Sequence, residues 1–410
     1  MRRIVGQEVK KVLSLRIFYI FFIIALLWNG LFLWNNDYVR SDVKRFLQVN
    51  EPQIVWTNDM MKEQQKMNQQ ASESLRKGEA TLVDVYQQAL NKGNVIEDEK
   101  FLKLLTEEVY WDHFIALHEQ RAALQVEEKV EQIVRMDGLT GNAAETLRKH
   151  IPALEMRFSK LIEQEAPTHY APNALFSQHD ALFGKLMRAV LMESVLIAIL
   201  ITALLTSYER EHRTASVVYS STVGRKVQIA KWLSSLFVAS STYVGLFLLS
   251  IGSYIALYTT PSLWTSYVSS SWNVEGPNLF MTWYPFTFIQ YVAVQWGIGL
   301  SIIVLIVFLT WAISLYWHQT YVATAAVIAI LFLLFIVPAF ISKSSSLLIY
   351  ATYTLSTLIV GTAHWLMMWK GYTLDPHFEW KTLLVSAITI GIISLFAWRH
   401  FKNKDWQEVE

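Results

Sequence analysis

One segment of the N-terminal half carries the side chains closest to a metal-binding or acid–base set. Asp112, His113, His118 and Glu119 lie within it. Carboxylates and imidazoles held on one helix face can bind zinc or transfer protons. On a helix, however, the step from His113 to His118 turns through roughly 500°, so the two rings point about 140° apart. We therefore expect surface histidines here and no metal site.

The sequence also lacks the signatures of covalent and nucleotide chemistry. It contains no Cys, which excludes disulfides, thiolate metal ligands and cysteine nucleophiles. The phosphate-binding pattern G-x-x-x-x-G-K-[ST] is missing, because the nearest pair, Gly184 and Lys185, lacks the upstream glycine and the following Ser or Thr. We predict that the chain is not an enzyme and binds no cofactor of its own.

Several polar residues fall inside apolar runs. A carboxyl group in hydrocarbon costs roughly 3 kcal/mol or more unless it is paired or hydrated, so Glu193 is a candidate for a substrate pathway. The alternative is that Glu193 faces the headgroups or the external domain and pairs with Arg188 or a neighbour. Gln290, Gln295 and His364 are candidates for the same pathway, or they form interhelical hydrogen bonds. An intramembrane enzyme would need Glu193 and His364 to meet, and nothing in the sequence brings them together.

The most informative charges lie in the segment 208–231, between two apolar runs. Mixed charges beside the short apolar stretch 217–219 are typical of a surface that docks a soluble partner by complementary charge. The alternative is that they are ordinary interfacial charges flanking a span. The residues concerned are Glu209, Arg210, Glu211, Arg213, Thr214, Gly224, Arg225 and Lys231.

The composition indicates what kind of scaffold positions these residues. Apolar residues make up 53% of the chain, charged residues only 17%, and there are 16 Trp, which is typical of a bilayer-embedded protein. Residues 36–185 hold 24 of the 34 acidic residues but only 18 of the 35 Lys and Arg. A basic membrane part beside a mildly acidic soluble part does not indicate nucleic-acid binding.

Apolar runs define the expected spans. The first run follows the basic residues Arg2, Arg3, Lys10, Lys11 and Arg16 and has no small-residue cleavage site, so we expect an uncleaved anchor whose basic end is cytoplasmic. Runs long enough to cross a bilayer occur at 15–34, 186–207, 233–258, 287–316, 320–341, 347–368 and 382–398.

Loop charges orient these runs. The segment 208–231 is rich in Lys and Arg and 259–285 has none, which predicts that the first is cytoplasmic and the second external. If all the runs crossed, the basic tail would end outside. The run 347–368 is the least lipid-like, because it carries Thr352, Thr354, Ser356, Thr357, Gly361, Thr362 and His364, and polar backbone is tolerated at membrane depth when it packs against protein. We therefore predict six crossings, a re-entrant helical pair at 347–368, and both termini in the cytoplasm.

The remaining segment, 36–185, is predicted to be an extracytoplasmic helical domain. Its glycines are sparse, and apolar residues recur at helical spacing between Glu, Gln, Lys and Arg. The expected organisation is 1–35 for the cytoplasmic N-terminus and first span, 36–185 for the external domain, and 186–410 for the transmembrane domain with its cytoplasmic loop. The fold class is all-α.

The segment 208–231 resembles the coupling segment of ABC transporter permeases of the second exporter class. In that family a Glu-Arg-Glu cluster is followed by Gly-Thr, by a Ser/Thr-rich turn with Pro and Gly/Ser-Arg, and by a Lys entering the next span. Arg213 stands where the family usually has Gly, and the usual Pro near Thr222 is missing. The tail at 401–405 and the order of elements are also similar to the family. The matching residues are Glu209, Arg210, Glu211, Thr214, Ser221, Thr222, Gly224, Arg225 and Lys231.

The resemblance implies that the chain is a permease that crosses the cell membrane several times. By analogy with the family, this would be a bacterial plasma membrane. A separate cytoplasmic ATP-binding subunit would carry the ATP and Mg²⁺ and dock on 208–225. A second permease copy or paralogue would complete a pathway for a hydrophobic, peptide or lipid-like substrate. The competing hypothesis, from a different class, is a membrane-anchored sensor or scaffold that binds a ligand or envelope partner through its external helices.

Overall fold

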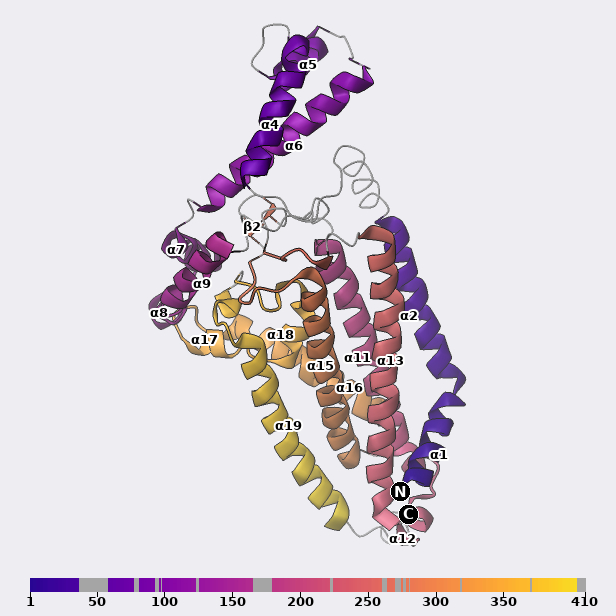
Figure 1. Cartoon of the computed structure of the whole chain (residues 1–410). Coiled ribbons are helices and arrows are strands. Elements are labelled where there is room, and N and C mark those ends of the chain that lie inside the picture. The colour runs from indigo at the N-terminus through magenta and orange to yellow at the C-terminus, as the bar shows by residue number, and fades with distance from the viewer. Residues whose placement is uncertain are drawn as a thin grey trace.

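Six helices of the computed structural model are long and apolar enough to cross a membrane (Figure 1). This confirms the predictions of an all-α chain and of six long apolar helices. In the described residues, strand structure is limited to the short pair β1 (Val274–Glu275) and β2 (Asn278–Leu279). The structure describes the whole chain except 37–57, 77–80, 93–95, 97, 123–124, 165–178, 222–223, 260–263, 270–273, 276–277, 280, 318, 369–370 and 404–410.

The long helices follow the predicted runs closely. Two of these helices begin with an extra turn. The π-helical turn η2 (Asp180–Leu186) precedes α11 (Met187–Glu211), and the 3₁₀ turn η3 (Gly224–Lys226) precedes α13 (Val227–Tyr258). One ends with an extra turn, η5 (Val337–Phe340), after α16. The helices themselves are α2 (Arg16–Asn35), α11 (Met187–Glu211), α13 (Val227–Tyr258), α15 (Phe288–Tyr316), α16 (Thr320–Ile336) and α19 (Phe378–Asn403).

The helix α11 forms the centre of the bundle. It packs against α13, α15, α16 and α2. Both α11 and α15 are largely buried, whereas α2 and α16 expose most of their apolar surface, as expected of helices that face lipid. The helices α13 and α15 approach closely at Gly299, where an added Cβ would lie 2.1 Å from the Tyr243 hydroxyl oxygen. Only glycine fits at that contact.

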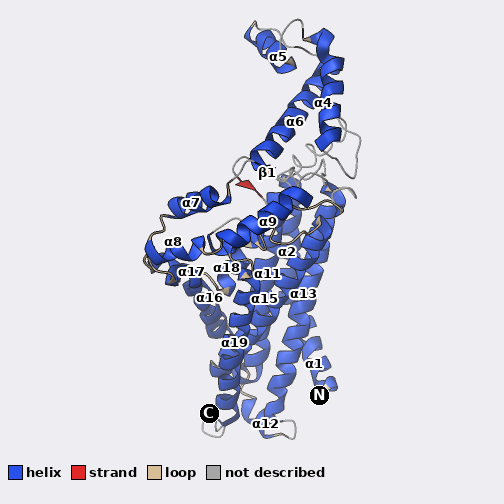
Figure 2. Ribbon diagram, turned by 60° about the vertical axis from the view of Figure 1, so that its left-hand side comes forward, coloured by secondary structure: helices blue, strands red, loops and turns tan. Residues whose placement is uncertain are grey.

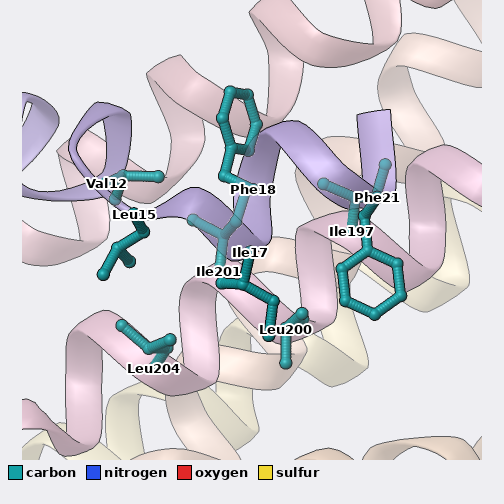
Figure 3. A pocket seen from close by; sticks show the side chains of 9 residues that line it. All are labelled: Val12, Leu15, Ile17, Phe18, Phe21, Ile197, Leu200, Ile201 and Leu204. Carbon is teal, nitrogen blue, oxygen red and sulfur yellow. The ribbon is translucent and has the colours of Figure 1, made fainter. Parts of the chain in front are cut away.

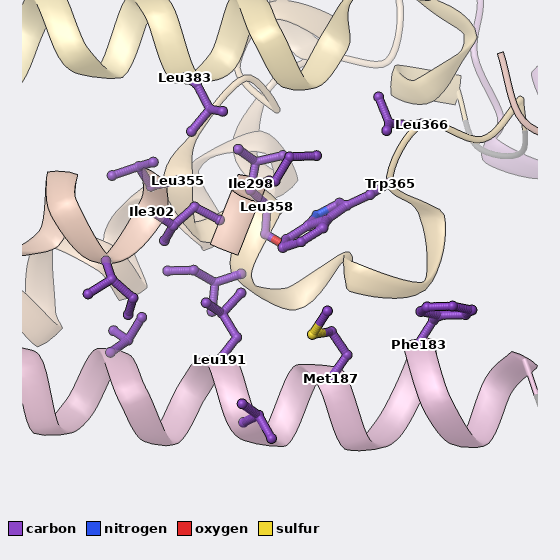
Figure 4. Close-up of a cluster of buried hydrophobic side chains, with 14 of the residues drawn as sticks. Phe183, Met187, Leu191, Ile298, Ile302, Leu355, Leu358, Trp365, Leu366 and Leu383 are labelled. Atoms are coloured by element: carbon purple, nitrogen blue, oxygen red, sulfur yellow. The ribbon is translucent and has the colours of Figure 1, made fainter. Parts of the chain in front are cut away.

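The segment 347–368 does not form a long helix. It contains α17 (Leu347–Tyr350), α18 (Leu355–Val360) and the 3₁₀ turn η6 (Thr362–His364), and η7 (Gly371–Leu374) follows. The side chains of Trp365 and Leu366 enter the core between α11, α15 and α19 (Figure 4). Leu366 adopts φ 59°, and its backbone N–H donates to the Glu379 carboxylate at 2.7 Å. The segment is thus anchored in the bundle at the end opposite to the short helix α12 (Ala215–Ser220) (Figure 1).

The helices between the first two spans fall into two groups. A distal hairpin consists of α4 (Asn58–Ser72), the turn η1 (Glu73–Leu75), α5 (Leu82–Asn91) and α6 (Glu99–Ala122), and it has its own small core. A proximal group consists of α7 (Val126–Asp137), α8 (Gly141–Arg148) and α9 (Ile151–Gln164), and its buried side chains belong to the same core cluster as the long helices. Figure 2 shows α7, α8 and α9 beside α17. The domain boundaries themselves stay a prediction.

Candidate functional site

The charged segment predicted as a docking site forms a short helix between two long ones. The helix α12 (Ala215–Ser220) follows α11 and is joined through η3 to α13. It lies at the end of the bundle where both described termini are found (Figure 1). An amphipathic helix that sequence reasoning missed, α1 (Arg2–Leu13), packs along α13 at the same end. Its buried side chains are Glu8 and Val12.

The turn from α11 into α12 depends on a left-handed residue. Arg213 has φ 55°, the Thr214 N–H donates to the Glu209 carbonyl at 2.8 Å, and the Arg213 N–H donates to the Arg210 carbonyl at 3.3 Å. These two bonds form a Schellman motif, whose left-handed position is usually glycine. The position where the family pattern has Gly is therefore one whose backbone favours Gly in this chain.

Glu209 is buried in a cluster of charges rather than exposed. Its carboxylate forms an ion pair with the Lys231 ammonium, which is 0% exposed and also donates to the Leu205 carbonyl. A second cation, Lys11 of α1, lies 3.7 Å from Glu209 and 3.1 Å from Glu8. The same Lys11 ammonium stands 4.0 Å from the ring centroid of Tyr208, within cation–π range. Glu209 thus connects α11 to α13 and to α1.

The next two charges bind the ends of two further helices. The half-buried Arg210 guanidinium donates to the Leu315 carbonyl at 3.1 Å and to the Ser314 carbonyl, in the last turn of α15. The Glu211 carboxylate accepts the Thr320 N–H at 2.6 Å, at the first residue of α16. These backbone groups have no partner inside their own helices, and each charge has the sign that stabilises the helix end it meets.

We call Lys11, Glu209, Arg210, Glu211 and Lys231 the charged brace. Its contacts run from the end of α11 to α1, α13, α15 and α16. A displacement of the backbone at 209–211 would therefore pull on α1, α13, α15 and α16, because these side chains bind all of them.

The side chain of Gln228 in α13 connects α12 to α11 by hydrogen bonds. Gln228 donates to the Tyr219 hydroxyl oxygen at 2.6 Å and to the Thr206 carbonyl at 3.1 Å. The Tyr219 ring packs edge-on against Phe401 of α19, with ring centroids 5.3 Å apart. Burial raises the pKa of Tyr219 to about 12, so the hydroxyl stays protonated at neutral pH.

The outer face of α12 is exposed and mixed in character. Val217 is 71% exposed, and Arg213, Thr214, Ser220 and Ser221 are exposed around it. Gly224 has φ 52°, and its N–H donates to the Ser221 hydroxyl oxygen at 3.3 Å. Arg225 is half-buried, and Thr222 lies outside the described residues. The predicted docking residues thus separate into the charged brace, centred on the buried pair Glu209 and Lys231, and the exposed face of α12.

The predicted pathway residues do not form one cluster. Glu193 is half-buried and accepts a hydrogen bond of 2.9 Å from the Asn29 amide of α2. Sequence reasoning missed this partner although Asn29 is a polar residue inside the first apolar run. Gln290 closes a capping box at the start of α15, where its side-chain oxygen accepts the Thr287 N–H at 3.0 Å. The Glu193–Asn29 contact is thus an interhelical hydrogen bond, and the Gln290 contact is a helix cap.

The other two pathway residues lie near the segment 347–368. Gln295 is 0% exposed and donates to the Thr362 carbonyl at 3.3 Å. His364 ends η6 and interacts electrostatically with His179. Glu193 and His364 therefore have different neighbours, which gives no support to an intramembrane catalytic pair.

A small apolar hollow lies between α2 and α11, and Glu193 is not among the residues that line it. The hollow between α2 and α11 has a volume of about 10 Å³, at the lower limit for one water molecule (Figure 3). Apolar side chains alone line it, namely Val12, Leu15, Ile17, Phe18, Phe21, Ile197, Leu200, Ile201 and Leu204.

The histidine segment of α6 shows no metal-binding arrangement where it is described. The Asp112 carboxylate accepts a hydrogen bond of 2.5 Å from Gln65, and the side chains of His113, His118 and Glu119 lie outside the described residues. In the described part of the chain, no group of three or more His, Cys, Asp or Glu residues could hold a metal ion.

Fold and site together define the class of the protein: the six long apolar helices indicate a multi-pass helical membrane protein. Comparison of the chain with protein-family models, with curated proteins and with solved structures gives no match. A function is therefore proposed from the chain's own contacts.

Proposed function

We propose that this chain is the membrane-spanning permease subunit of an ATP-driven ABC exporter, with α12 as the element that receives the ATP-binding subunit. The observation that carries the proposal is the charged brace directly behind an exposed short helix. Glu209, Arg210 and Glu211 each hold a different long helix, so force applied to α12 would reach the transmembrane bundle. A permease of this kind needs such a rigid link because its own sequence has no phosphate-binding loop.

The proposal assigns separate roles to the two parts of the predicted docking site. The exposed face around Val217, with Arg213 and Ser221, contacts the partner, and the charged brace transmits its movement. Mixed apolar and charged surface of this kind supports specific docking and fast association with a complementary partner. Glu209 is then a transmitting residue and not a contact residue.

The same proposal fixes the orientation. The end with α12 and the basic segment 208–231 is cytoplasmic, and the segment 347–368 is a re-entrant helical pair at the external side. The absence of Lys and Arg from 259–285 supports this assignment. The helices of 58–164 then lie outside the cell, and a second permease copy or paralogue completes the pathway for a hydrophobic, peptide or lipid-like substrate.

Replacement of Val217 by Asp tests the docking role. A buried carboxylate at a partner interface is strongly unfavourable, so V217D should reduce the co-purifying ATPase activity about tenfold or more. The measurement is ATP hydrolysis by the tagged chain purified in mild detergent from membranes of its native host. V109D is a matched control, since Val109 is a 49% exposed valine on the distal hairpin.

Two outcomes contradict the proposal. The unsubstituted chain could purify without ATPase activity above background, or V217D could retain the activity of the parent. The first outcome would favour the sensor or scaffold hypothesis. That alternative rests on the distal hairpin, which has its own core and extends away from the spans (Figure 1).

A further inference from the structure

A groove lies where the proximal helices meet the segment that follows α16. It has a volume of about 570 Å³, within the range of pockets that hold small molecules. One wall comes from α7, and the others come from η5, α17 and η7. Its apolar lining includes Ile133, Met136, Pro338, Ile341, Leu348 and Tyr372.

Hydrogen bonds join the segments that form the walls of the groove. The Lys343 ammonium donates to the Asp137 carbonyl at 2.9 Å, and the Thr140 N–H donates to the Lys343 carbonyl at 3.0 Å. The Ala143 N–H donates to the Ser344 carbonyl at 3.3 Å. The Lys343 side chain therefore ties α7, and two backbone hydrogen bonds tie the start of α8, to the loop at 342–346.

Its polar lining favours an anion. Two cations, Lys129 and Lys343, line the groove, against one acidic side chain, Asp137. Lys129 donates to the Gln132 side-chain oxygen at 3.2 Å, and burial lowers the pKa of Lys129. An ammonium group carries three donors, so Lys129 and the exposed Lys343 can both donate charge-assisted hydrogen bonds to a phosphate in the groove.

The position of the groove identifies the source of the anion. Its η5 wall directly continues the long apolar helix α16. Met136 of the groove lining is 67% exposed, and two apolar residues that adjoin lining residues in the chain, Phe340 (83%) and Leu347 (59%), are exposed as well. The helix α16, which leads into η5, also exposes apolar side chains, among them Phe332 at 61%. The groove begins where a membrane-spanning helix ends, and it combines apolar walls with cations. A site of this kind is expected at the depth of the lipid headgroups in a bilayer.

We propose that this groove binds one anionic phospholipid, with an acyl chain along the apolar walls and the phosphate between Lys129 and Lys343. The lipid would join the proximal helices to the segment after α16 and would stabilise that junction. The site is separate from α12, and its existence does not depend on an ATP-binding partner.

Lipid retention by the purified full-length chain tests the site. The chain in detergent is incubated with equal amounts of dioleoyl-phosphatidylglycerol and dioleoyl-phosphatidylcholine, and the retained lipid is measured by native mass spectrometry. We expect the parent to prefer the anionic lipid about tenfold, since charge-assisted hydrogen bonds to phosphate are the strong ones. K129Q/K343Q should lose the preference, and K149Q/K160Q, a matched change at exposed lysines of α8–α9, should keep it.

A second variant tests the apolar part of the groove. A339W places a large ring in the groove from an exposed position and should reduce the retention of both lipids. Melting temperatures in detergent check that all variants remain folded. The proposal fails if the parent shows no preference for the anionic lipid, if K129Q/K343Q retains it, or if A339W holds as much lipid as the parent.

Discussion

At the scale of single residues, Glu209 and Lys231 form a buried ion pair. Lys231 is fully buried at the start of a span, and its ammonium meets one carboxylate and one carbonyl. Taking two charges out of water is costly, and their attraction offsets that cost only while both partners are present. The pair therefore behaves as a unit, and the loss of either half leaves a buried charge behind.

Replacement of Lys231 alone should show this dependence. K231M leaves the Glu209 carboxylate buried without its main partner, and breaking a buried pair costs about 3–5 kcal/mol. The expected result is a clear fall in melting temperature in detergent, followed by fluorescence. K226M is the matched control, since Lys226 is an exposed lysine just before α13.

The double variant E209Q/K231M separates pairing from simple packing. Removal of both charges should recover a large part of the stability lost in K231M, because no isolated charge remains. If K231M were as stable as K226M, or if E209Q/K231M were no more stable than K231M, Glu209 and Lys231 would not be acting as a coupled pair.

At the scale of elements, the junction between the proximal helices and the bundle contains titratable groups. His150 lies between α8 and α9, and burial lowers the pKa of His150, with Lys381 acting in the same direction and Asp375 against it. Burial alone would raise the pKa of Asp375, but hydrogen bonds from Lys381, from the His377 N–H and from Tyr353 outweigh it and lower the pKa. Neutral His150 and ionised Asp375 are thus the forms that the fold favours.

This arrangement predicts acid sensitivity of the junction. The folded chain binds the His150 proton less readily than the unfolded chain, so the contribution of neutral His150 is complete above the ordinary value of 6.5 and is lost as the pH falls below it. In H150Q the melting temperature should therefore decline less between pH 6.5 and about pH 5 than in the parent. H212Q, at an exposed histidine of the opposite end, should keep the slope of the parent, and equal slopes in parent and H150Q would contradict the assignment.

The helices and their contacts also differ in how well the sequence predicts them. The long apolar helices were predictable because each is a continuous apolar run, and 347–368 stood apart through its Ser and Thr content. The partners of Glu209 and Glu193 were not predictable from the sequence. Lys231 and Asn29 come from other helices, and only three-dimensional packing brings them close. The helix α1 was missed because its basic residues were interpreted only as a topology signal. Local patterns specify helices, whereas contacts between distant segments decide the site.

At the scale of the whole molecule, the two ends of the bundle differ in charge and in structure. One end carries α12, the basic segment 208–231 and both described termini, and the other carries the helices of 58–164 and the segment 347–374 (Figure 1). Every functional assignment above depends on which end faces the cytoplasm. Positive charge near the ends of spans is retained on the cytoplasmic side, which predicts that α12 is inside.

The chain has no Cys, so a single introduced cysteine reports its location without background. S220C places the thiol at an exposed position of α12, and T265C places it at an exposed position in the Lys- and Arg-free segment 259–285. In intact cells, a membrane-impermeant maleimide should label T265C and not S220C, and permeabilisation should make S220C reactive. Because a span cannot invert without carrying its loops across the hydrocarbon, the two positions must give opposite answers. Labelling of S220C in intact cells with T265C protected would place α12 outside, where no cytoplasmic ATP-binding subunit could reach it. Reaction at both positions would mean that the helix between them, α13, does not cross the membrane.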